Sequence, residues 1–83
     1  MNAATPQDEA VATLRAELAE VDREIARVRQ SAEQIRSGVS EAEDPADRGA
    51  LIQAADEQDN LGDELVVRRE DLLRRIADAE RQA

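Results

Sequence analysis

The sequence predicts an all-α protein, and within that class a long antiparallel two-helix coiled-coil hairpin. Three observations lead to this prediction: a heptad pattern of apolar residues in the first half, a second pattern in the other half, and a short acidic connection. Apolar residues that alternate by three and four positions form the contact seam of a coiled coil. Because the connection is short, we expect the helices to fold back on each other, as one domain over residues 1–83, rather than to form a parallel two-chain coiled coil.

The first helix is predicted over about residues 6–38. Thr5 suits the capping position, Pro6 the first helical position and Asp8 the third, which is a variant of the capping box. Gly38 follows Ser37 and is expected to end the helix in a left-handed conformation. The seam of this helix is predicted at nine positions: Val11, Leu14, Leu18, Val21, Ile25, Val28, Ala32, Ile35 and Val39.

The second helix is predicted over about residues 45–81, after an acidic turn at about 39–44. It starts in the same way, with Asp44 as the cap, Pro45 in the first position and Asp47 in the third. Its apolar pattern is less regular, because Gln58 falls where an apolar residue is expected and Arg68-Arg69 occupy another turn of the seam. Gly62 costs about 1 kcal/mol relative to Ala inside a helix. The predicted seam is Leu51, Ala55, Leu61, Leu65, Leu72, Ile76 and Ala79.

Composition excludes most catalytic chemistry. The chain of 83 residues has no aromatic residue, no His, no Cys and no Lys, so the usual general base, thiolate nucleophile and zinc ligands are absent. Two helices also enclose no deep ligand pocket. We therefore expect a binding protein that is not an enzyme, with no catalytic residue, no cofactor-binding residue and no metal site of its own.

The net charge of −9 points to the kind of partner. Twenty acidic residues against 11 Arg would be repelled by a phosphate backbone, so no direct nucleic-acid binding is expected and a basic protein surface fits better. No apolar run approaches the roughly 20 residues that span a bilayer, and residues 1–8 lack the pattern of a signal peptide. The expected location is the bacterial cytoplasm, with no membrane association.

The predicted turn gathers acidic residues at one tip of the rod. Its charged residues are Glu41, Glu43, Asp44, Asp47 and Arg48. The stretch Asp44-Pro45-Ala46-Asp47-Arg48 resembles the tip motif of the DksA/TraR regulators of bacterial RNA polymerase, a coiled-coil hairpin family related in shape to the Gre-type factors. The family has Ala where Gly49 stands here, and its hairpin continues into a four-cysteine zinc finger that these 83 residues lack.

The resemblance implies a transcription regulator. Hairpins of this family place their acidic tip in the secondary channel of RNA polymerase, near the catalytic Mg²⁺. By that resemblance, Asp44 and Asp47 would approach the partner's metal ion or its water shell, which prefers oxygen ligands. The remaining tip residues would contact the channel, and catalysis would stay with the polymerase.

Other interpretations of the same residues stay open. Asp-Pro-x-Asp is also how an ordinary capped helix begins, as the start at Thr5 shows. A self-associating structural or adaptor coiled coil, including a homodimer or an antitoxin that binds a basic partner, accounts for apolar residues off the seam: Ile52, Val66, Val67 and Leu73. A secreted hairpin of the WXG type is less suitable because its Trp-x-Gly turn is absent. The acidic stretch 56–64 does not fit a calcium loop, since Leu61 stands in place of the invariant Gly.

Overall fold

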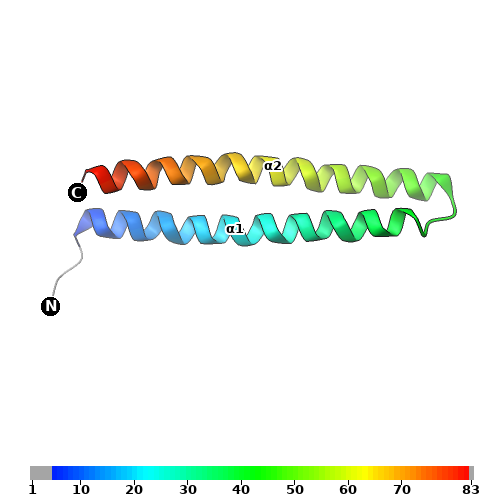
Figure 1. The fold of residues 1–83 in the computed structure, drawn as a ribbon, viewed down its shortest axis with the longest axis horizontal. Coiled ribbons are helices and arrows are strands. Elements are labelled where there is room, and N and C mark those ends of the chain that lie inside the picture. Colours follow the sequence, from blue (N-terminus) through cyan, green and yellow to red (C-terminus); the bar gives the residue numbers. More distant parts are fainter. Residues whose placement is uncertain (1–4, 83) are drawn as a thin grey trace.

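The chain forms one helical hairpin. A computed structural model describes residues 5–82 as two α-helices, α1 (Pro6–Val39) and α2 (Pro45–Arg81), with no strand in this range. The helices run antiparallel along their whole length and the turn joins them at one end of a rod, as Figure 1 shows. The predicted all-α hairpin is thereby confirmed, and neither helix within residues 5–82 is long and apolar enough to cross a membrane.

Both helices start where the capping signals place them. The backbone N–H of Asp8 donates to Thr5 Oγ1 at 3.0 Å, and the N–H of Thr5 donates to Asp8 Oδ2 at 3.3 Å, which completes a capping box. At the start of α2 the N–H of Ala46 donates to Asp44 Oδ1 at 2.9 Å. These bonds satisfy N–H groups that have no partner inside the helix.

The end of α1 differs from the prediction. The helix continues through Gly38 to Val39, and no described residue has a positive φ, so the expected left-handed glycine is wrong. Instead, Ser40 stays right-handed and the carbonyl oxygen of Gly38 accepts bonds from the N–H groups that follow, including that of Ala42 at 3.1 Å. The tight turn satisfies this helix end without a left-handed residue. Gly38 instead faces α2, where an added Cβ would meet Leu51 Cδ1 at 3.7 Å.

The α1 side of the seam is the predicted one. Four of its nine residues are buried and the other five are half-buried. Around Val21, Ile25 and Leu72 the core also includes half-buried leucines from both helices, among them Leu14 and Leu65. The core is a single line of aliphatic side chains between two helices.

The α2 side requires one correction. Leu61 is 41% exposed, and the seam passes through Gly62, which is buried against α1. The seam of α2 therefore keeps a strict alternation of four and three positions, through Leu51, Ala55, Gln58, Gly62, Leu65, Arg69, Leu72, Ile76 and Ala79. Leu61 is one position away from this spacing, which is a rotation of about 100° around the helix. Its side chain therefore points away from α1, although it is larger and more apolar than Gly62.

Candidate partner-binding site at the acidic turn

The five predicted tip residues lie together at the end of the rod. They occupy the turn and the first helical turn of α2, and every one of their side chains is exposed. The turn lies at the far end from the start of α1 and the end of α2 (Figure 1). The tip is therefore a continuous charged surface that the rest of the rod does not cover.

Two of the five side chains hold the turn itself. Asp44 caps α2 through one carboxylate oxygen, and its carbonyl oxygen accepts the N–H of Arg48 at 3.1 Å. The guanidinium of Arg48 donates through Nη2 to the carbonyl oxygen of Glu43 at 3.0 Å. Asp44 and Arg48 thus have structural roles, and the interpretation of Asp44 as a helix cap is confirmed.

The other three acidic side chains have no such role. The carboxylates of Glu41, Glu43 and Asp47 make no hydrogen bond or ion pair with any residue of the range 5–82. In the same range no group of three or more acidic side chains is arranged to hold a metal ion. These carboxylates are therefore available to a partner.

Charge is distributed unevenly along the rod. Residues 25–65, the half that ends in the turn, contain ten acidic residues and four Arg, a net charge of −6. The remaining residues contain ten acidic residues and seven Arg, a net charge of −3. A basic surface is therefore attracted preferentially to the turn end, over the screening length of about 8 Å at physiological ionic strength.

Within the acidic half, Arg36 neutralises part of the charge. Its guanidinium donates to the carboxylate of Asp59, with Nη1 to Oδ1 at 3.3 Å, and Nη2 lies 3.6 Å from Asp56 Oδ1. The hydrogen bond from Arg36, together with its positive charge, lowers the pKa of Asp59 below its usual value. The same bond raises the pKa of Arg36, so both groups stay charged at neutral pH.

Ion pairs between the helices fix their alignment. They join Arg15 to Glu80 at 2.9 Å, Arg36 to Asp59, Arg69 to Asp22 at 2.6 Å and Arg68 to Glu17 at 3.9 Å. Exposed ion pairs contribute little to stability, but wrong alignments lose all of them at once. Sequence reasoning missed these pairs because they lie 23 to 65 positions apart in the chain. Once the antiparallel alignment is known, these pairs can be predicted from the charged residues that flank the two heptad patterns.

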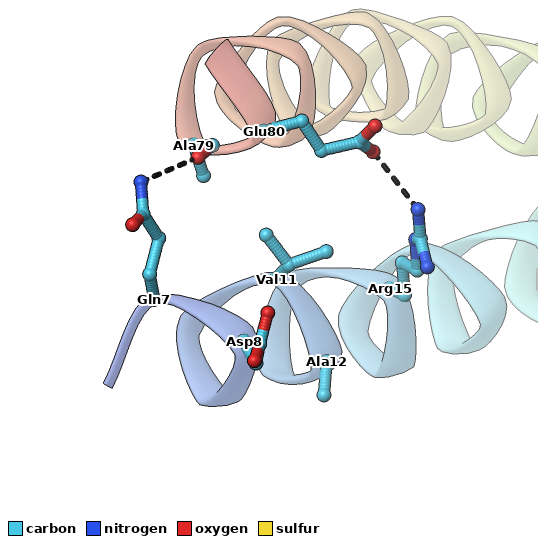
Figure 2. A pocket seen from close by; sticks show the side chains of 7 residues that line it. All are labelled: Gln7, Asp8, Val11, Ala12, Arg15, Ala79 and Glu80. Carbon is cyan, nitrogen blue, oxygen red and sulfur yellow. Dashed lines mark hydrogen bonds and ion pairs between the residues drawn. The ribbon is translucent and has the colours of Figure 1, made fainter. Parts of the chain in front are cut away.

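The other end of the rod has a shallow hollow of about 430 Å³ between the two helices. Figure 2 shows Val11 at its floor, with Gln7 on one side and Arg15 on the other. Gln7 Nε2 donates to the carbonyl oxygen of Ala79 at 3.0 Å, and Arg15 pairs with Glu80. Both polar side chains are therefore engaged in holding the helix ends together.

Comparisons with family models, with curated proteins and with solved structures find no match to this chain. The likeness to the polymerase regulators therefore depends on the turn motif and the hairpin shape alone.

Proposed function

We propose that the protein is a regulator that inserts the acidic end of its rod into a basic site on a partner, and that bacterial RNA polymerase is this partner. The observation that carries the proposal is the group of unpaired carboxylates at the tip, Glu41, Glu43 and Asp47, beside the capping residue Asp44.

The shape of the rod suits insertion into a channel. With 34 and 37 residues, the helices are about 50 and 55 Å long at 1.5 Å per residue. Two helices side by side present a cross-section of roughly 20 by 10 Å. A rod of this kind reaches deep into a narrow opening with its charged end first, which a globular domain of the same mass does not.

The chemistry of the tip suits a metal-dependent active centre. Carboxylate oxygens are the ligands that Mg²⁺ prefers, and this ion keeps several water molecules to which nearby carboxylates hydrogen-bond. Three free carboxylates at the tip would interact with such a water shell or with basic residues around it. The polymerase performs the reaction, and the hairpin modulates it.

The test is a binding titration of the chain against bacterial RNA polymerase core enzyme, with a transcription assay in parallel. A neutral-tip variant carries Glu41→Gln, Glu43→Gln, Asp44→Asn and Asp47→Asn. Asn caps a helix about as well as Asp, so α2 keeps its start. We expect saturable binding by the natural chain and a change in transcription that the neutral-tip variant loses.

A matched control removes the same amount of charge elsewhere. Glu9, Glu24, Glu64 and Glu70 are exposed and unpaired within the described residues, and their replacement by Gln also leaves a net charge of −5. This variant should bind as the natural chain does. Equal loss in both variants would show that overall charge alone drives binding, and absence of binding by the natural chain would refute the polymerase as the partner.

A further inference from the structure

Helix α2 has more apolar surface than α1 covers. Ile52, Val66 and Leu73 belong to a stripe with seven-residue spacing, completed by Asp59 and Glu80, which we call the flank stripe. Ile52 is 49% exposed and Leu73 is 40% exposed, while Val66 is half-buried at the edge of the core. Whereas the Leu, Ile and Val residues of α1 all lie at seam positions, α2 adds this second stripe directly beside its seam. A seam with one added stripe is typical of a helix that contacts two neighbours in a bundle.

The flank stripe lies on one broad face of the hairpin. Its two acidic members pair across the seam with α1, Asp59 with Arg36 and Glu80 with Arg15. Arg29 lies on α1 one heptad before Arg36, which places it at the level of Val66. It has no ion pair with any residue between 5 and 82.

We propose that this face binds a second copy of the chain in antiparallel orientation, which makes a four-helix bundle. A two-fold axis that passes between positions 59 and 66 places Ile52 against Leu73 of the second copy, twice. The same axis crosses the middle of α2, so the two rods overlap along nearly their whole length. It also brings Arg29 of one copy to the level of the Arg36–Asp59 pair of the other, so that its guanidinium meets Arg36 as well as Asp59.

Charge along α2 selects the antiparallel orientation. Residues 45–63 contain five acidic residues and one Arg, a net charge of −4, whereas residues 64–81 contain five of each and are neutral. A parallel dimer would place the two acidic halves together. The antiparallel dimer instead places each acidic half against a neutral half, which avoids this repulsion.

The available area is sufficient for a dimer. A face about 55 Å long and two helix diameters wide offers about 1,100 Å² per copy, against roughly 800 Å² per partner in an ordinary interface. The net charge of −9 on each copy opposes association over long range. Dimerisation should therefore strengthen between about 0.05 and 0.5 M salt, as the repulsion is screened.

Sedimentation equilibrium measures the association, and cysteine cross-linking measures the orientation. Leu73→Gln should weaken the dimer at least tenfold, whereas Val67→Gln, the matched control at a residue that is 64% exposed and lies off the stripe, should leave it unchanged. A monomer mass up to about 1 mM would overturn the proposal.

Because the chain has no cysteine, single Ile52→Cys and Leu73→Cys variants report orientation directly. Mixed in equal amounts and oxidised, they should form the mixed disulfide in preference to either symmetric one, since only the antiparallel dimer brings positions 52 and 73 within the 4.4–6.8 Å that a disulfide spans between Cα atoms. Predominance of the symmetric disulfide at position 52 would indicate a parallel dimer and refute the proposal.

Discussion

Replacing Gly62 with alanine should stabilise the hairpin, although the residue is buried in the seam. A Cβ at this position would lie 3.7 Å from Val28 Cγ1, which is ordinary van der Waals contact, and Gly62 has helical φ and ψ. Alanine gains about 1 kcal/mol in helix propensity over glycine. The new methyl group, shielded from water by α1, adds up to about 0.8 kcal/mol. We therefore expect a gain of about 1 to 2 kcal/mol in the free energy of unfolding.

Thermal and urea unfolding followed by circular dichroism measure this gain, at protein concentrations low enough for the chain to be monomeric. For a domain of this size each kcal/mol raises the melting temperature by about 4–8 °C. Gly49→Ala is the matched control, because a Cβ at the exposed Gly49 meets no atom within 4 Å and gains helix propensity only. If Gly62→Ala destabilised the chain, or gained less than Gly49→Ala, the helices would have to approach more closely than described or to meet in another alignment.

Three further predictions test single contacts. Leu61→Ala should lower the free energy of unfolding by less than about 1 kcal/mol because the side chain is 41% exposed, whereas Leu72→Ala, at 2% exposure, should lower it by about 2–5 kcal/mol. Equal losses in urea unfolding would place Leu61 in the seam. Asp44→Ala should cost about 0.5–2 kcal/mol by removing the bond to the N–H of Ala46, while Asp44→Asn should cost almost nothing, and a large loss in both variants would contradict a role limited to capping. Arg36 lowers the pKa of Asp59, so this carboxylate stabilises the fold above its unfolded-state pKa, near 3.9, and the stabilisation is lost as the pH falls through the lower folded-state pKa. The difference in unfolding free energy between the natural chain and Asp59→Asn should therefore shrink below about pH 4. A difference that is constant with pH would show that the pair with Arg36 does not form.

The sequence contained the information for both helices and their starts because those signals are local. The capping box of Thr5 and Asp8 and the cap at Asp44 involve residues no more than three positions apart. The heptad pattern of α1 is uninterrupted, so its seam could be assigned without knowledge of the partner helix. The end of α1 was less predictable, since Gly38 suits a left-handed cap and a helical position equally well, and contact with Leu51 favours the second.

The seam of α2 depended on information that the local pattern lacks. Leu61 is the larger apolar residue, so the local pattern favours it over the adjacent glycine. The reason becomes visible only in the folded hairpin, where Val28 of α1 lies against Gly62 and the seven-residue spacing of the seam places the glycine at the contact. The seam position of Arg69 also depends on the other helix. Its side chain is half-buried there, and its guanidinium donates a hydrogen bond to Asp22 of α1.

The function of the turn is the part that sequence and fold define least. Asp44 would take the same position in an ordinary capped helix and in a polymerase-binding tip, because both require a helix start at Pro45. The difference lies in Glu41, Glu43 and Asp47, whose carboxylates the hairpin does not use, and a partner is required to show what they bind.

Site-specific photo-cross-linking to RNA polymerase core enzyme shows directly which end of the rod enters the partner. A photoreactive residue at Ala46, exposed at the tip, is compared with one at Ala12, exposed near the other end. If the tip inserts, Ala46 cross-links to segments around the catalytic centre, and Ala12 reaches only the outer surface or none. Cross-links from Ala12 alone, or the same outer-surface contacts from both positions, would contradict insertion of the acidic tip.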